Sequence, residues 1–232
     1  MDSAQQFHPA AQRAQTRTLF RHHRVVTTVQ LERLELMRAA DTLRLPRVDL
    51  DVRTQSDQAS SLTGVTFVAA DERWLRQPPR ELLHHSLLAE THVRLIGESA
   101  LPVPHPSFEY LDLRGRSGVW PDAQFRLPAG GGHDWSVEVD TGYSPKRRDQ
   151  KLIAAAQDGY GTLVWATSVH GRVEKVARRI RELHRARELR QVQQAIVLYV
   201  NVHTADRDPY APRRRLNKSS LIHIDLAGSA DE

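Results

Sequence analysis

Two strand-length runs of mostly apolar residues in the second half of the chain limit its fold more than any other feature. They span residues 162–167 and 193–202, and each follows a stretch with helical periodicity, at 146–156 and 172–190. A strand that is apolar on both faces has to be covered on both faces, which is typical of sheets flanked by helices. The alternation of helices and strands therefore predicts an α/β domain.

Three further strands are predicted before this part of the chain. Residues 108–113, 119–127 and 135–140 have strand patterns, and turn residues separate them, including three glycines at 130–132. Short connections between such strands predict an antiparallel meander. With the flanking helices, the order is helix, three strands, helix, strand, helix, strand, which predicts a mixed sheet between helices. An additional edge strand is expected at 221–226.

The first part of the chain has a different pattern and predicts a small α+β domain. Residues 10–23 favour a helix, and Thr27 with Gln30 three residues later fits a capping box at the start of another. Residues 48–52 and 65–68 have the composition of paired strands. Two short helices followed by a hairpin are compatible with a winged helix-turn-helix.

These patterns divide the chain into four parts, with boundaries after residue 18, at the proline pair 78–79 and after the last buried strand. The parts are a disordered tail at 1–18, a winged-helix-like domain at 19–77, the α/β domain at 80–205, and a basic C-terminal tail with an edge strand at 206–232. For the second part, a small α+β domain with no role in DNA binding is the alternative, because no clear recognition helix appears between Met37 and Pro46.

Composition narrows the classes of partner and metal site. The chain of 232 residues has no cysteine, so any metal must be held by oxygen or imidazole ligands. A net charge of +5 favours a polyanionic partner such as nucleic acid. No run approaches the roughly 18 apolar residues of a membrane helix, and the N-terminus lacks the apolar core of a signal peptide. We therefore expect no membrane partner and a cytoplasmic location.

Three carboxylates are expected to converge on the meander. Glu138 and Asp140 are two residues apart on one strand and share a face, and the turn at 128–134 places Asp122 roughly opposite Asp140. Carboxylates this close raise one another's pKa unless a cation joins them. Hard oxygen ligands select Mg²⁺ or Mn²⁺. A solvated acidic face is the alternative, and Pro121 directly before Asp122 favours the metal site.

The motif Pro121-Asp122 followed by Glu138-Val139-Asp140 resembles the PD-(D/E)xK nuclease superfamily. The predicted order of elements fits the α-β-β-β-α-β core of that superfamily. The resemblance implies that Asp122, Glu138 and the carbonyl of Val139 hold a divalent metal, and we expect Asp140 to join this cluster as a ligand and catalytic residue. The position that usually holds a catalytic lysine is Asp140 in this chain.

A narrower resemblance is to the replication-relaxation family, whose members are plasmid- and mobile-element-associated proteins with a winged helix before a PD-(D/E)xK-like domain. The segments 121–123, 138–142, 151–152 and 82–89 are similar to that family. The resemblance covers about residues 80–205, and 20–75 only loosely.

Some superfamily members carry the lysine on the next helix, where Lys151 is the first candidate and Lys146 the second; an exposed helix residue is the alternative for Lys151. Glu90, on the helix before the sheet, is a candidate extra metal ligand, and a solvent-facing acid is its alternative. Basic residues on two helices and in the tail are candidate DNA contacts, with solvated charge as the alternative: Lys146, Arg147, Arg178, Arg179, Arg185, Arg213, Arg214 and Arg215.

The expected function is that of a DNA-binding protein with a Mg²⁺- or Mn²⁺-dependent endonuclease-like domain, acting on phosphodiesters in plasmid or mobile-element replication, mobilisation or DNA processing. Asp140 in the usual lysine position leaves two alternatives open. One is a catalytically inactive nuclease fold that binds DNA. The other is an assembly module that binds protein partners in a larger complex. A homodimer is also an open alternative.

Overall fold

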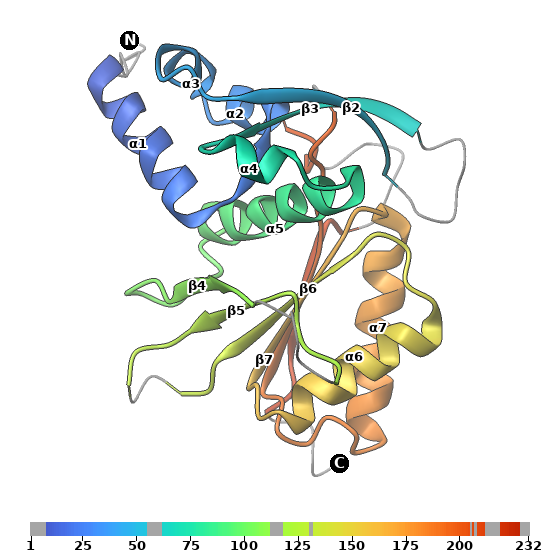
Figure 1. Cartoon of the computed structure of the whole chain (residues 1–232). Helices are drawn as coiled ribbons and strands as arrows, with labels where there is room; N and C mark the ends of the chain where they lie inside the picture. Colours follow the sequence, from blue (N-terminus) through green and yellow to red (C-terminus); the bar gives the residue numbers. More distant parts are fainter. Residues whose placement is uncertain are drawn as a thin grey trace. The chain divides into compact units, whose positions relative to one another are not determined.

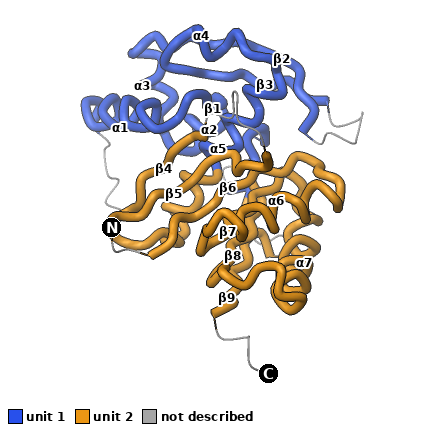
Figure 2. The backbone as a smooth tube through the Cα atoms, turned by 60° about the horizontal axis from the view of Figure 1, so that its bottom comes forward, with its two compact units in different colours: residues 1–54, 60–90, 201–209 blue, residues 55–59, 91–200, 210–232 orange. Residues whose placement is uncertain are grey.

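The computed structural model describes residues 8–54, 62–111, 118–129, 132–204, 206, 208–211 and 219–227. The chain forms two compact units (Figure 2), and each contains segments that are distant in the sequence. The first unit comprises 1–54, 60–90 and 201–209, and the second comprises 55–59, 91–200 and 210–232. The boundary therefore falls inside a helix, later than the predicted boundary at 78–79, and the segment after 200 belongs to the first unit.

The first unit contains a three-stranded antiparallel sheet in the order β1-β3-β2. Figure 1 labels β2 and β3 of this sheet. The predicted hairpin is confirmed as the pair β2 and β3, whereas β1 was not expected. The elements along the chain are α1 (Pro9–His22), β1 (Val25–Thr27), α2 (Thr28–Arg33), α3 (Met37–Thr42), β2 (Arg47–Arg53), β3 (Leu62–Ala69), α4 (Glu72–Leu75) and α5 (Pro79–Gly97). Because α1 begins at Pro9, the prediction of a disordered tail over 1–18 is wrong from Pro9 onward.

The capping box at the start of α2 is confirmed, and it connects α2 to a distant segment. The Thr27 hydroxyl accepts the Gln30 backbone N–H at 3.3 Å, and the Gln30 side chain accepts the Thr27 N–H at 2.8 Å. The same hydroxyl donates to the carbonyl of Val202 at 2.8 Å. Arg33, at the end of α2, donates to the carbonyl of Asn201 at 2.6 Å. These bonds hold the segment after residue 200 within the first unit.

We expect Thr27→Ala to lower the free energy of unfolding by about 2 kcal/mol, because it removes a helix cap and leaves the Val202 carbonyl without this donor. Chemical denaturation measures the change. Thr28→Ala is the matched control, since Thr28 is the first residue inside α2 and does not cap it. Equal losses in the two variants would contradict this account.

The second unit is built on a six-stranded mixed sheet in the order β4-β5-β6-β7-β8-β9. The predicted antiparallel meander is confirmed as β4-β5-β6, which is followed by parallel β7 and β8 and by antiparallel β9 at the edge. The elements are β4 (Ser107–Tyr110), β5 (Ala123–Arg126), β6 (Trp135–Asp140), α6 (Pro145–Gln157), β7 (Thr162–Thr167), the 3₁₀ turn η2 (His170–Arg172), α7 (Val173–Arg185), β8 (Gln194–Tyr199) and β9 (Leu221–Asp225).

Both faces of the central strands are covered, as their composition predicts. Trp165 and Val197 share a core with the apolar side chains of α6 and α7, among them Leu152 and Ile180. The alternate strand residues, such as Val164, are also buried. Within the second unit, the last turns of α5 contact the meander, where the His92 ring stacks on Phe108 at 4.6 Å. None of the helices in the described residues combines the length and apolar character of a membrane span.

Two residues that flank the basic segment 213–215 in the sequence are held by hydrogen bonds in the second unit. Arg213, Arg214 and Arg215 lie outside the described residues, but Tyr210 before them and Ser220 after them are described. Ser220 Oγ donates to the Tyr210 carbonyl at 3.3 Å, and the buried Arg94 guanidinium donates to the Ser220 carbonyl at 2.9 Å. The chain then enters β9. The prediction of a C-terminal basic tail is therefore corrected to a connection between β8 and β9.

Candidate functional site

The register of the β5–β6 hairpin determines which acidic residues face each other. Ala123 pairs with Val137, so position 122 lies opposite Glu138 and not opposite Asp140 as predicted. The Asp122 N–H donates to the Val137 carbonyl at 3.0 Å, and the Val139 N–H donates to Asp122 Oδ2 at 2.8 Å. The Asp122 carboxylate is thereby held against β6, at the point where pairing with β5 ends.

Lys151 on α6 joins this pair of carboxylates. Its ammonium nitrogen lies 2.8 Å from Glu138 Oε1 and 3.6 Å from Asp122 Oδ1, and it donates to the carbonyl of Trp120 at 2.6 Å. The side chains of Lys151 and Glu138 are each 4% exposed, and that of Asp122 is 8% exposed. The alternative of a solvent-exposed lysine is therefore wrong, and the structure brings Lys151 to the acidic pair.

Local sequence explains why α6 presents Lys151 inward. The helix begins after Ser144, whose hydroxyl accepts the Arg147 N–H, and Pro145 occupies the first turn. Leu152 and Ala155 then pack in the core against α7 and the central strands. Lys151 directly precedes Leu152 and belongs to the same buried side of the helix.

Burial and charge shift the proton affinities of this site. The pKa of Glu138 is raised well above its usual value, first because burial penalises the charged form and second because Asp122 is nearby, while Lys151 acts in the opposite direction. The pKa of Tyr143 is also raised, by burial and then by the charges of Asp122, Glu138 and Asp140. The described residues give the Glu138 carboxylate no well-aligned hydrogen bond, so its close contact with Lys151 is an ion pair. Such a carboxylate is stabilised by a proton or by a cation.

The shifted Glu138 pKa predicts a specific pH dependence of stability in the metal-free protein. A folded-state pKa above the unfolded value means that the folded chain binds the extra proton, so stability falls as pH rises from the unfolded pKa through the folded pKa. Glu138→Gln removes this contribution, which reaches about 1.4 kcal/mol per pH unit within that window. Denaturation in a chelator from pH 4 upward measures it, with exposed Glu188→Gln as the control. An unchanged pH slope in Glu138→Gln would contradict the assignment.

Asp140 serves a different set of partners. Its Oδ1 accepts the N–H groups of Gly142 and Tyr143 at 2.7 and 2.5 Å, and its Oδ2 lies 3.1 Å from the Arg172 guanidinium. Gly142 has a φ of 134°, which favours glycine at this turn. Among the described residues, no three histidine or acidic side chains are placed to hold one ion. The acidic site therefore consists of Asp122 and Glu138, not of the three carboxylates predicted.

Asp140→Asn is expected to lower the free energy of unfolding by about 2 kcal/mol, because an amide still accepts the turn N–H groups but no longer pairs with the partly exposed Arg172. Asp140→Ala removes the acceptor as well and should cost more. Thermal or chemical denaturation of the two variants measures this order. A loss of activity in Asp140→Asn at unchanged stability would instead support a catalytic role.

Two further metal ligands were predicted, Glu90 and the carbonyl of Val139, and the structure places them differently. Glu90 accepts from Arg33 at 3.1 Å and from the Gln30 side chain at 2.7 Å within the first unit, so both of its oxygens are engaged. This arrangement gives no support to Glu90 as an extra ligand. Val139 directs its N–H to Asp122, and since the N–H and C=O of a strand residue point to the same side, its carbonyl lies on that side too.

The basic residues predicted to contact DNA fall into three groups. Arg179 is engaged, because its guanidinium pairs with Asp149 at 3.0 Å and with Glu182 at 2.9 Å and so connects α6 to α7. Arg213, Arg214 and Arg215 lie outside the described residues. The other predicted contacts are exposed, and they are Lys146, Arg147, Arg178 and Arg185.

Two groups that bind these side chains, one at the site and one at the neighbouring Asp140, have no signal in the sequence. The Trp120 carbonyl binds Lys151 because of where the chain enters β5, and Arg172 pairs with Asp140 because of where α7 begins. In the sequence, Arg172 is one of several basic residues in the stretch 172–190. Comparison with known proteins yields no significant match to a family model, a curated protein or a solved structure.

Proposed function

We propose that this chain is a DNA-binding protein with a metal-dependent endonuclease site formed by Asp122, Glu138 and Lys151. The observation that carries the proposal is the position of the Lys151 ammonium, 2.8 Å from Glu138 and 3.6 Å from Asp122. An acid before a strand, an acid on the next strand and a lysine from the following helix form the arrangement that the PD-(D/E)xK resemblance implies when the lysine has moved. The burial of these three side chains at one site supports the proposal more strongly than the sequence motif alone.

The arrangement of elements supports the same proposal. The last turns of α5, the β4-β5-β6 meander, α6 and β7 belong to the second unit and occur in the order of the α-β-β-β-α-β core, with α7 before the last strand. In the first unit, helix, strand, two helices and a hairpin occur in the order of a winged helix, with β1 added to the hairpin. Both orders agree with membership of the replication-relaxation family, which we propose on the motifs given above.

The residues of the site fit a hard divalent cation. Asp122 and Glu138 supply carboxylate oxygens, and the Val139 carbonyl is directed to the same side. Among the described residues, the Glu138 carboxylate has its ion pair with Lys151 but no well-aligned hydrogen bond. A magnesium site commonly needs only one or two carboxylates together with water and phosphate. Mg²⁺ or Mn²⁺, when bound, would lower the pKa of a coordinated water and neutralise charge on the scissile phosphate.

The chain's own contribution is electrostatic. Lys151 holds a positive charge in a site that is almost closed to solvent, where charge interactions are stronger than in water. An ammonium in that position stabilises negative charge that develops on phosphate oxygens during hydrolysis. The carboxylates of Asp122 and Glu138 keep the ammonium in place before substrate arrives.

Incubation of supercoiled plasmid with the full chain and Mg²⁺ or Mn²⁺ should produce nicked circles. Asp122→Asn, Glu138→Gln and Lys151→Met should each lower the rate on the order of a hundredfold, because each removes a ligand or the charge that stabilises the transition state. Lys175→Met, which removes an exposed charge from α7, is the control and should nick like the wild type. Equal nicking by the wild type and all site variants would refute a nuclease site here.

A second candidate is a nuclease fold that binds DNA without cleaving it, as an assembly or replication factor. Two observations favour it: Asp140 occupies the usual lysine position, and Lys151 already has three oxygen partners. The plasmid experiment separates the two candidates, since this one gives salt-dependent binding to DNA and no metal-dependent nicking. Copurification with protein partners in the absence of nucleic acid would instead favour the assembly role.

A further inference from the structure

The N-terminal helix carries a charge pattern that the acidic site does not explain. From residue 3 to residue 31 the chain contains no Asp or Glu, and it contains four arginines. Three of them, Arg13, Arg17 and Arg21, are spaced by four residues within α1. Positions four apart lie on one face of a helix and rise by about 6 Å per step, so the row extends over roughly 12 Å.

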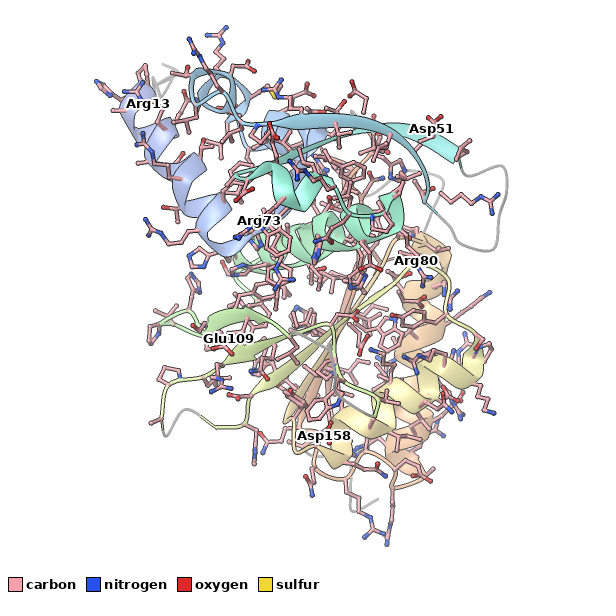
Figure 3. The ribbon with its side chains drawn as sticks, in the orientation of Figure 1. Arg13, Asp51, Arg73, Arg80, Glu109 and Asp158 are labelled. Carbon is pink, nitrogen blue, oxygen red and sulfur yellow. The ribbon has the colours of Figure 1, made fainter. Side chains whose placement is uncertain are left out.

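The packing of α1 turns this row away from the core of the first unit. Thr16 is fully buried, and Leu19 and Phe20 pack against the core formed by α2, α3, α5 and β3. Arg17 and Arg21 are exposed, and the described residues supply neither of them with a carboxylate partner. Figure 3 labels Arg13 on this helix.

Two other arginines of the first unit have partners within the unit. Arg24 lies over the Trp74 ring at 4.7 Å, and Arg33 is paired with Glu90 at 3.1 Å. Each of these has a structural contact within the unit. Arg17 and Arg21 differ because their charge is directed to solvent, where it is free to meet a partner outside the chain.

The helix that would read DNA in a winged helix is a poor candidate for that role here. Helix α3 has six residues, and its charged members are one arginine, Arg38, and one acid, Asp41. Asp41 is bound by Arg47, the first residue of β2. With Asp41 paired to Arg47, Arg38 is the one charge that α3 offers to a phosphate backbone, fewer than the row of α1 offers.

We propose that the first unit binds the phosphate backbone of duplex DNA through the arginine row of α1. The inference rests on the proposed DNA-binding function and assigns it a surface separate from the acidic residues of the second unit. Arginine is suited to phosphate because its planar guanidinium donates two parallel hydrogen bonds. An anionic membrane fits less well, because the apolar side chains of α1 that would enter a lipid surface, Leu19 and Phe20, pack against the core of the unit.

The exposure of the arginines differs along the row. Arg13 is half-buried and lines a groove of about 700 Å³ between α1 and the α2–α3 segment, and Glu32 and Glu35 line the same groove. These two acids offset the charges of Arg13 and of Arg38, which also lines the groove. Arg17 and Arg21 do not line the groove. We therefore expect them to provide most of the attraction.

The salt dependence of binding to a 25-base-pair duplex, measured for the full chain in a chelator so that no cleavage occurs, tests this surface. R17Q/R21Q should lower the slope of log K against log[salt] by about 2, since each phosphate contact contributes roughly 0.9. R13Q should lower it by less. R17K/R21K should keep the slope because it keeps the charge. R80Q/R190Q makes the same change of net charge at two exposed arginines and should match the wild type; Figure 3 labels Arg80.

The outcomes are distinguishable from failure of the proposed function. If the wild type does not bind the duplex at low salt, the DNA-binding function is refuted, and this inference with it. Wild-type binding with an unchanged slope in R17Q/R21Q would overturn the surface alone, as would an equal change in R80Q/R190Q. Binding to phosphatidylserine vesicles that R17Q/R21Q abolishes, with no change on DNA, would assign the row to lipid instead. If R17Q/R21Q does not fold, R17Q and R21Q singly should each lower the slope by about 0.9.

Discussion

The ion cluster of Lys151 with Asp122 and Glu138 joins three parts of the second unit: the entry to β5, the middle of β6 and the helix α6. All three side chains are at most 8% exposed. Removing such charges from water costs several kcal/mol per ion, and only close, mutual pairing offsets that cost. The position of α6 against the meander therefore depends on this cluster, because any displacement of Lys151 would leave two buried carboxylates without their cation.

Charge balance in the neighbourhood gives the cluster its chemical character. Asp140, two residues after Glu138, takes Arg172 as its cation, so three carboxylates share two basic side chains. One negative charge is left over within a few residues of β6. Burial is the first cause of the raised pKa values of Glu138 and Tyr143, and neighbouring carboxylates raise them further. A site in this condition favours either a proton or an added cation, which is the property that the proposed metal-dependent chemistry requires.

The arginines that contribute to the net charge of +5 are of two kinds, those with partners inside the units and those exposed to solvent. Arg33, Arg94, Arg172 and Arg179 are engaged inside the units, where they bind carboxylates or backbone carbonyls. Arg17 and Arg21 on α1, and Arg178 and Arg185 on α7, are exposed instead. Only the exposed group can neutralise phosphates and release counterions. The exposed arginines, and not the total basic composition, therefore indicate a polyanionic partner.

Local sequence patterns determined much of this molecule. The run from Thr162 to Thr167 became β7 with both predicted ends, the Thr27–Gln30 capping box formed at the start of α2, and the meander and the edge strand formed where alternation and turn residues indicated them. These features depend on hydrogen bonds and side-chain periodicity within a few residues, so the sequence contains the information needed to predict them. The bounds of α7 and the unit boundary inside α5 were less accurate, since packing decides where such elements end.

Only the tertiary structure decided which charges meet. The motif brought Asp122, Glu138 and Asp140 together on paper, yet the hairpin register set Asp122 opposite Glu138, and the turn at Gly142 directed Asp140 to Arg172. The family resemblance named Lys151 as the first candidate lysine, and in the folded chain α6 brings its ammonium to Asp122 and Glu138. The sequence by itself determined that acids and a lysine would be available. Their pairing was decided by register and helix packing, because electrostatic contacts between distant residues depend on ångström-scale positions that only the folded chain defines.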